Sequence, residues 1–258
     1  MNFRKQLPLE SLSESLRSWF AGELGQDLLA SEQRIINILL PRIYGATAVQ
    51  IGIDPLCDMA EESSIPYRVM VHHSLTLGMT ARSVIAQATE LPFEHNSVDL
   101  VILHHSLDFT QNPHQVLREA ERILRPGGHI ILVAFNPISW WGIRRLFTRK
   151  SKQGLWQQAH FISHHRLVDW ISLLELTELR TLSDYFLPPC ESTGLRKRFS
   201  FLQPFGRRSF PRMGAFNVIL ARKDIGGAIL TTNKRVNRTF ITLPVAKPAT
   251  RGQMRETR

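Results

Sequence analysis

Cysteine is scarce in this sequence: only Cys57 and Cys190 occur among 258 residues, far apart and without paired spacing. That spacing excludes a disulfide framework and argues against a zinc site, so both are expected to be ordinary buried thiols. No apolar run reaches the ~18 residues that a membrane helix needs, and the initial MNFRKQLPLESLSES has no apolar core of a signal peptide. We therefore expect a cytoplasmic protein with no membrane partner and no bound metal.

Acidic residues are almost missing from the C-terminal end. The formal net charge is +10, and residues 232–258 hold seven basic residues against the single acid Glu256, so +6 of the total lies there. From residue 226 onward no hydrophobic periodicity is sustained, which predicts a basic, disordered tail at 226–258. The rest is only mildly basic, and any nucleic-acid binding is expected to be weak and salt-sensitive.

The clearest pattern in the chain lies between residues 91 and 137. The run VDLVIL at 98–103 has the length of a buried parallel strand. Asn112-Pro113 then predicts a helix start with a capping side chain, and the apolar positions of 116–124 share one helical face. The segment RPGG ends that helix, and a second buried strand is predicted at 129–135.

These residues carry a family resemblance. LPF, SVDLVILHHSLDF, ILRPGG and HIILVAFNP, in this order and spacing, resemble the core of the class I S-adenosylmethionine-dependent methyltransferases, in particular the small-molecule group of the ubiquinone and biotin pathways. The resemblance implies an α/β fold, a doubly wound, seven-stranded, mostly parallel sheet with N-terminal helices. It also implies S-adenosyl-L-methionine as cofactor and methyl transfer to a small-molecule acceptor. The acceptor and the oligomeric state stay open.

The resemblance also suggests cofactor-binding residues, although the family pattern is altered here. The glycine-rich turn after the first strand, predicted at 48–53, retains only Gly52. Asp54 after it either accepts a hydrogen bond from the cofactor's ammonium group or, as we favour, begins a helix with Pro55. His72 stands where the family has the ribose-binding acid, after a strand predicted at 67–71. Gln87, in a third strand predicted at 83–88, stands where an aspartate contacts adenine.

His104 and His105 end the fourth strand. Neighbouring strand residues point to opposite faces, so we expect only one of them to face a pocket, which makes a metal pair improbable. That one is a candidate catalytic base, and His104 is also a candidate cofactor contact; a polar residue that merely ends the strand is the equal alternative.

The remaining segments complete three predicted regions: helices before the first strand at 1–47, a methyltransferase-like domain at 48–225, and the tail at 226–258. Two amphipathic helices broken near Gly25 either cover a pocket or simply pack. Further helices are predicted at 140–150 and 166–176, and strands at 179–186 and 215–222. Residues 196–212 hold six basic residues and should lie at an edge of the sheet. They support an alternative function, a degenerate methyltransferase fold that acts as a binding or interaction module, with RNA as the candidate partner.

Overall fold

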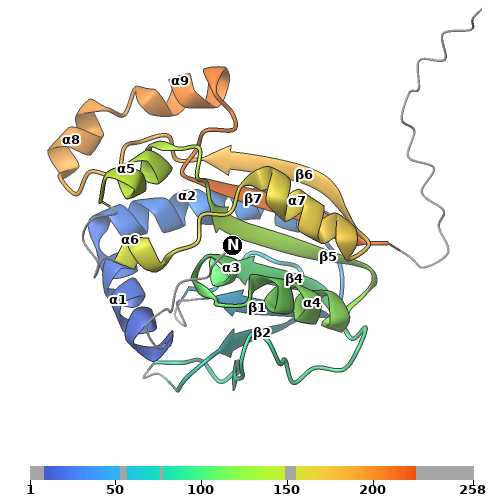
Figure 1. The fold of residues 1–258 in the computed structure, drawn as a ribbon. Coiled ribbons are helices and arrows are strands. Elements are labelled where there is room, and N and C mark those ends of the chain that lie inside the picture. The colour runs from blue at the N-terminus through green and yellow to red at the C-terminus, as the bar shows by residue number, and fades with distance from the viewer. Residues whose placement is uncertain (1–8, 53–56, 76–77, 149–154, 225–258) are drawn as a thin grey trace, which may run out of the picture. The chain divides into compact units, whose positions relative to one another are not determined.

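The computed structural model describes residues 9–52, 57–75, 78–148 and 155–224. Its centre is one seven-stranded sheet with the order β3-β2-β1-β4-β5-β7-β6, in which only β7 runs antiparallel to its neighbours (Figure 1). The strands are β1 Thr47–Gly52, β2 Tyr67–His72, β3 Ser83–Ile85, β4 Val98–His104, β5 Leu124–Phe135, β6 Leu176–Asp184 and β7 Phe216–Lys223. The predicted doubly wound α/β fold is confirmed.

Helices cover both faces of this sheet. They are α1 Leu9–Ala21, α2 Glu23–Leu39, the 3₁₀ turn η1 Leu40–Arg42, α3 Ser106–Phe109, α4 Pro113–Ile123, α5 Trp140–Thr148, α6 Leu155–Gln158, α7 His164–Leu173, α8 Thr193–Arg198 and α9 Leu202–Ser209. Side chains of α1 and α2 share one core with Leu100 and Ile102 of β4, whereas α4 and α7 pack on Val101 and Leu103, which point the other way. Alternate residues of one strand therefore supply two cores, as a strand covered on both faces requires.

The strand-helix-strand unit follows its prediction closely. The fourth strand and the helix after it lie where the apolar patterns put them, but β5 begins at Leu124, which pairs with Val98 of β4. The residues RPGG lie inside β5, in the irregularity between this pair and the next one, Leu100 with His129. Asn112 makes no side-chain cap; its backbone carbonyl accepts the amides of Gln115 and Val116 instead. The later elements differ from their predicted limits by a few residues, and both cysteines are only partly buried.

Among the described residues, no helix lies between β1 and β2. Residues 57–66, between β1 and β2, form no helix, and Asp54 itself lies outside the described residues, as does the predicted tail. Pro55 also lies outside the described residues, so the helix start at Asp54-Pro55 stays a prediction. Here α1 and α2, from before the first strand, contribute helical side chains to the core on this face, together with Trp141 of α5.

Gly25 explains how α1 and α2 meet. The break between them falls at Gly22, three residues earlier than predicted, and Gly25 lies inside α2. A Cβ on Gly25 would stand 2.5 Å from both the Trp19 carbonyl oxygen and the Phe20 Cα, which belong to backbone that cannot move aside cheaply. Glycine is therefore required at position 25 because the backbone of α1 comes too close for any side chain, and not because of a special backbone conformation.

We expect Gly25→Ala to destabilise the protein by about 1 to 3 kcal/mol, because the added methyl forces the two helices apart. Urea unfolding measures this. Gly194→Ala in α8 is the matched control: its Cβ would meet only the Ser192 Oγ, at 3.8 Å, so it should be neutral or slightly stabilising. Equal stabilities of the two variants would contradict this account.

The basic segment 196–212 follows the edge strand β6 and forms α8 and α9. Arg196 is buried and binds Glu23 and Asp27 of α2 at 3.0 and 3.1 Å. Arg207 donates to both carboxylate oxygens of the buried Asp184, which also binds Arg34 of α2. Two of the six basic side chains thus attach the segment to the domain.

Candidate functional site

The site lies where the strand order reverses. β1 and β4 are parallel neighbours, β2 lies on the far side of β1 and β5 on the far side of β4, and Gly52 pairs with His104 at the carboxyl ends. In open α/β sheets, ligands bind in the crevice at this point, because the connections from adjacent strands leave in opposite directions. Gly52 and His104 are therefore side by side at the edge that such a ligand would approach.

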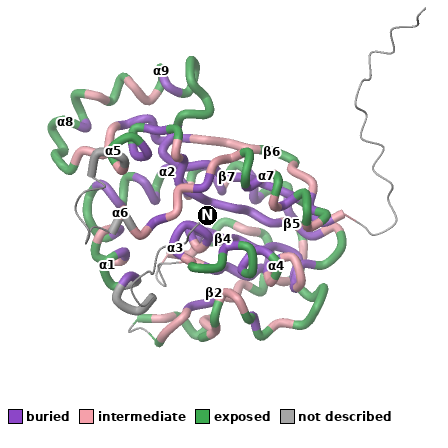
Figure 2. Tube along the Cα trace, viewed as in Figure 1, coloured by how far each residue is buried: buried purple, intermediate pink, exposed green. Residues whose placement is uncertain are grey.

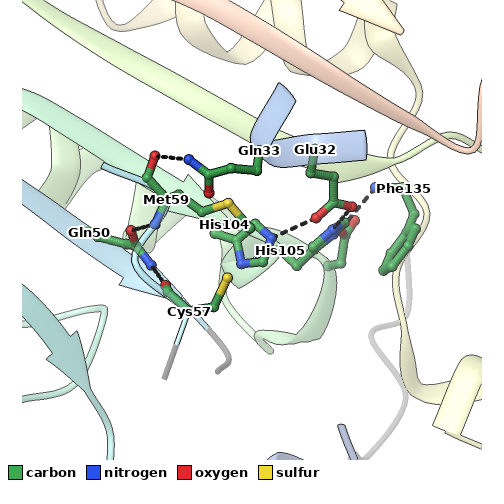
Figure 3. A network of polar contacts seen from close by, with 9 residues as sticks. Glu32, Gln33, Gln50, Cys57, Met59, His104, His105 and Phe135 are labelled. Atoms are coloured by element: carbon green, nitrogen blue, oxygen red, sulfur yellow. Dashed lines mark hydrogen bonds and ion pairs between the residues drawn. The ribbon is translucent and has the colours of Figure 1, made fainter. Parts of the chain in front are cut away.

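A fully buried polar network stands behind this edge (Figure 3). Glu32, from α2, holds one imidazole with each carboxylate oxygen: Oε2 lies 2.8 Å from His104 Nε2 and Oε1 lies 2.9 Å from His105 Nε2. His105 Nδ1 lies 2.8 Å from Asp108 Oδ2, which also accepts the Phe135 amide at 3.0 Å. One chain of hydrogen bonds thus links α2, β4, α3 and the end of β5.

Both histidines face Glu32, so the prediction that their rings would diverge was wrong. Strand alternation ends at His104, because His105 adopts a left-handed conformation (φ 52°, ψ 8°) as the residue before α3. That turn brings its ring back beside its neighbour, with ring centroids 4.8 Å apart. A histidine at this position does not signal a left-handed conformation, since glycine and asparagine are its usual markers.

Glu32 was missed by the sequence reasoning, although a signal existed. It lies between Leu28 and Ile36 at four-residue spacings, on the apolar stripe of α2, and all three side chains are buried. A carboxylate on a buried helical face needs a partner, which makes it a candidate for function. The partner could not be identified from sequence because β4 lies some seventy residues away.

The network also sets the charge states of its members. Burial alone would raise the pKa of Glu32, but the charge of His105 and hydrogen bonds from both histidines outweigh it and lower that pKa to about 2. Burial would lower the pKa of His105, but the Glu32 charge and the hydrogen bonds to Asp108 and Glu32 raise it to about 9. Burial raises the pKa of Asp108, against the opposing effect of His105. At neutral pH the centre is an ionised Glu32 beside a protonated His105.

Glu32, His104 and His105 also form the one group of potential metal ligands found among the described residues, with ligand atoms within 4.8 Å of one another. The nitrogen–oxygen distances of 2.8 and 2.9 Å are those of hydrogen bonds. Ligands of a tetrahedral zinc ion stand about 3.3 Å apart, given bonds of about 2.0 Å. The arrangement is that of a hydrogen-bonded network.

The polypeptide that follows β1 is held by a second buried polar side chain. Gln50 accepts the Met59 amide at 2.8 Å and donates to the Cys57 carbonyl at 2.5 Å, while Gln33 of α2 donates to the Met59 carbonyl at 3.2 Å (Figure 3). These bonds secure the far end of the connection whose first residues follow Gly52. Met59 is thus connected both to β1, through Gln50, and to α2, the helix that supplies Glu32, through Gln33.

The other predicted cofactor residues have different settings. His72 is buried at the end of β2 and pairs with Ile85 of β3, whose side chain is exposed, as is that of Leu75. Gln87 is exposed and follows a third strand that is shorter than predicted, in an isolated bridge with Glu90. Gly52, His72 and His104 thus end three adjacent strands, whereas Gln87 lies two residues beyond β3.

Aromatic rings surround the His105 end of the network. Phe135 stacks on His105 with ring centroids 4.0 Å apart, and Trp156 meets Phe135 edge-on at 5.2 Å. Trp19 and Trp141 contact Trp156 at 4.7 and 5.3 Å. Helices α1, α5 and α6 therefore meet over the end of β5 through large apolar side chains, which keep water from the charged pair.

Residues 43–132 match the protein family described as a methyltransferase domain. The chain is 30% identical to the uncharacterised protein YafS of Escherichia coli K12 over 191 residues, 74% of each chain. It is 27% identical to the ubiquinone/menaquinone biosynthesis C-methyltransferase UbiE of Cereibacter sphaeroides over 139 residues, 51% of this chain and 53% of that one.

Among solved structures, the fold is similar to that of a SAM-dependent methyltransferase from Thermotoga maritima, with a TM-score of 0.63. The two sequences are 22% identical, and the match covers 84% of this chain and 98% of the other. A likeness at this identity concerns the fold, and it includes the sheet on which the site is built.

Proposed function

The chain belongs to the class I S-adenosylmethionine-dependent methyltransferases, and we propose that it binds S-adenosylmethionine at the carboxyl ends of β1, β2 and β4 and methylates a small or medium-sized acceptor there. The observation that supports this most is the pairing of Gly52 with His104 at the strand-order switch, backed by a buried charged network. The fold supplies the ligand crevice and the network supplies fixed charge beside it.

The residues at this edge fit the cofactor. A Cβ on Gly52 would stand 3.6 Å from both the His104 Cβ and the Gln50 Nε2, so the glycine leaves room beside the histidine where a side chain would otherwise lie. Exposed Ile85 and Leu75, near His72, offer apolar surface for the adenine ring. His72 can form one hydrogen bond to the ribose, and the amide of Gln87 can accept one from the adenine amine.

Bound S-adenosylmethionine would supply an electrophilic methyl group on a sulfonium ion. The protein's own part is mostly to position the acceptor in line with that methyl and to exclude water. Aromatic side chains around the end of β5 serve the second purpose, since Phe135, Trp141 and Trp156 pack over the charged pair.

An acceptor that carries a hydrogen at its reacting atom must also lose a proton, and His104 is the better of the two candidate bases. His105 is excluded because both of its ring nitrogens are engaged by carboxylates and its pKa is raised to about 9. An ionised Glu32 accepts a hydrogen bond from His104 Nε2, and the other ring nitrogen of His104, Nδ1, lies 3.8 Å from where a Gly52 side chain would begin, at the edge that a ligand would approach.

Isothermal titration with S-adenosylmethionine and its demethylated product tests the proposal. We expect micromolar or weaker binding, because a histidine in place of the ribose-binding carboxylate forgoes about 1.5 to 3 kcal/mol. Gly52→Ala should weaken binding roughly tenfold while leaving the fold intact, since its methyl enters the crevice at ordinary contact distance. His72→Ala should weaken it by a similar factor.

His73→Ala is the matched control, because this neighbouring histidine lies beyond the end of β2, and it should bind like the parent. Absence of heat with either ligand at millimolar concentration, on folded protein, would reject the proposal. Equal loss in the His72 and His73 variants would reject the assignment of His72 alone.

The alternative function, an RNA-binding module, gains no support from the basic segment as a whole. Arg196 and Arg207 are engaged by Glu23, Asp27 and Asp184. The four other basic residues of this segment lie among exposed apolar side chains, a combination that is more typical of a membrane surface than of an RNA site.

A further inference from the structure

The surface formed by α8, α9 and the turns around them combines exposed apolar and basic side chains. Its apolar members are Leu195, Phe201, Phe205, Phe210 and Met213, and its basic members are Lys197, Arg198, Arg208 and Arg212, all exposed. We call this set the α8–α9 surface. The helices appear at one end of the domain in Figure 1, and Figure 2 shows long exposed stretches along both. No acid occurs between residues 192 and 223.

The segment is amphipathic, and its inner face is already occupied. Gly206 of α9 is buried so closely on Phe186 that a Cβ would stand 2.3 Å from the Phe186 ring, and Gln203 accepts the Phe186 amide at 3.1 Å. Phe201 and Phe205, four residues apart on the opposite face, remain 61% and 55% exposed. Phe210 is 50% exposed, with its ring centroid 6.0 Å from that of Phe205. The outward face therefore presents a group of phenylalanines to solvent.

Four of the six cations of this segment differ from the other two in their partners. Arg196 and Arg207 pair with acids of α2 and β6. Among the described residues, no ion pair within 4.0 Å involves Lys197, Arg198, Arg208 or Arg212, and these exposed side chains flank the phenylalanines in the sequence. Exposed phenylalanines surrounded by positive charge are complementary to an anionic bilayer, whose interface accepts rings and whose phosphates attract cations.

We propose that the α8–α9 surface binds peripherally to a bilayer containing anionic phospholipid. A bilayer fits better than single-stranded nucleic acid, because Leu195 and Met213 offer no flat ring for base stacking, whereas both can enter the interface. The proposal does not depend on the proposed function. The expectation of no membrane partner rested on the absence of a membrane-spanning segment. The described helices include none with the length and apolar character of a membrane span. Peripheral binding does not require a spanning helix, so the proposal is compatible with this finding.

Co-sedimentation of the full chain with phospholipid vesicles tests the proposal, with phosphatidylcholine alone and with about one third phosphatidylglycerol. Binding is expected only to the anionic vesicles. Changing Lys197, Arg198, Arg208 and Arg212 to Gln should reduce it at least tenfold, since each cation near the surface is worth roughly fivefold in affinity. Changing Phe201, Phe205 and Phe210 to Ala should also reduce it roughly tenfold or more, with the net charge unchanged.

The matched control changes four exposed arginines elsewhere, Arg42, Arg82, Arg118 and Arg222, to Gln, and should bind within about twofold of the parent, given the short range of surface charge. Every variant keeps the basic residues at 232–258, which can attract anionic vesicles by charge alone. If the phenylalanine variant binds the vesicles as well as the parent does, the binding is due to charge alone and the proposal is overturned. Failure of the full chain to bind anionic vesicles would overturn it too. If the full chain binds oligouridylate but no vesicles, and the charge variant loses the oligouridylate binding, the surface is a nucleic-acid site instead.

Discussion

Replacing Glu32 with alanine is expected to lower the free energy of unfolding by about 3 to 5 kcal/mol, the usual cost of removing one partner of a buried ion pair. The carboxylate is completely buried and connects α2 to both His104 and His105 by hydrogen bonds. Without it, a protonated His105 would stay in the core with Asp108 as its sole carboxylate partner in the network. Urea denaturation near neutral pH measures the loss.

Two companion variants separate charge from packing. Glu14→Ala removes an exposed acid of α1 and should change stability by no more than about 0.5 kcal/mol. Glu32→Gln keeps the size and two hydrogen-bonding atoms but lacks the charge, so it should fall between the parent and Glu32→Ala. A Glu32→Ala variant within about 1 kcal/mol of the parent would show that the network contributes little to the fold.

The stability of the protein should fall as pH rises from 6.5 to about 9. His105 has a folded-state pKa of about 9 against an ordinary value of 6.5, so the native state holds this proton more tightly than the unfolded state does. Its contribution is complete below pH 6.5 and is lost as pH rises through the folded-state pKa, which amounts to about 3 kcal/mol. Urea unfolding across this range gives the slope.

His105→Asn is the variant that should flatten this dependence, because asparagine does not titrate and tolerates the left-handed conformation (φ 52°) of the position. His165→Asn removes an exposed histidine from α7 and should keep the parent's slope. If the slope persists in His105→Asn, some other group is responsible for it. Glu32 acts in a separate window: its pKa of about 2 is below the ordinary 4.5, so its contribution is lost as pH falls from 4.5 toward 2.

The fold was predictable because its signals are local. Continuous apolar runs predicted buried strands, and the apolar stripe of 116–124 together with Pro113 predicted α4. Boundaries were less accurate: RPGG could not show that β5 begins at Leu124, since pairing with β4 decides that. The same holds for Asn112, whose type suits a cap but whose side chain forms none.

The site was predictable only in part, because its geometry depends on residues far apart in the chain. Gly52, His72 and His104 do end neighbouring strands, as the family pattern implied. Strand alternation predicted that the His105 ring would point away from that of His104. This was wrong because His105, directly after β4, adopts a left-handed conformation that ends the alternation. The basic segment looked like a single charged surface, yet acids of α2 and β6 engage two of its six cations.

By itself, then, the sequence determined the class of fold and the family, because apolar periodicity and turn residues act over a few neighbouring positions. Tertiary structure alone decided that α1 and α2 pack into one of the two cores of the sheet, and that Glu32 of α2 meets two histidines of β4 and the turn after it. The physical reason is burial: a carboxylate removed from water must find a charged or hydrogen-bonding partner. Which partner it finds depends on how helices and strands pack, and no local pattern records that.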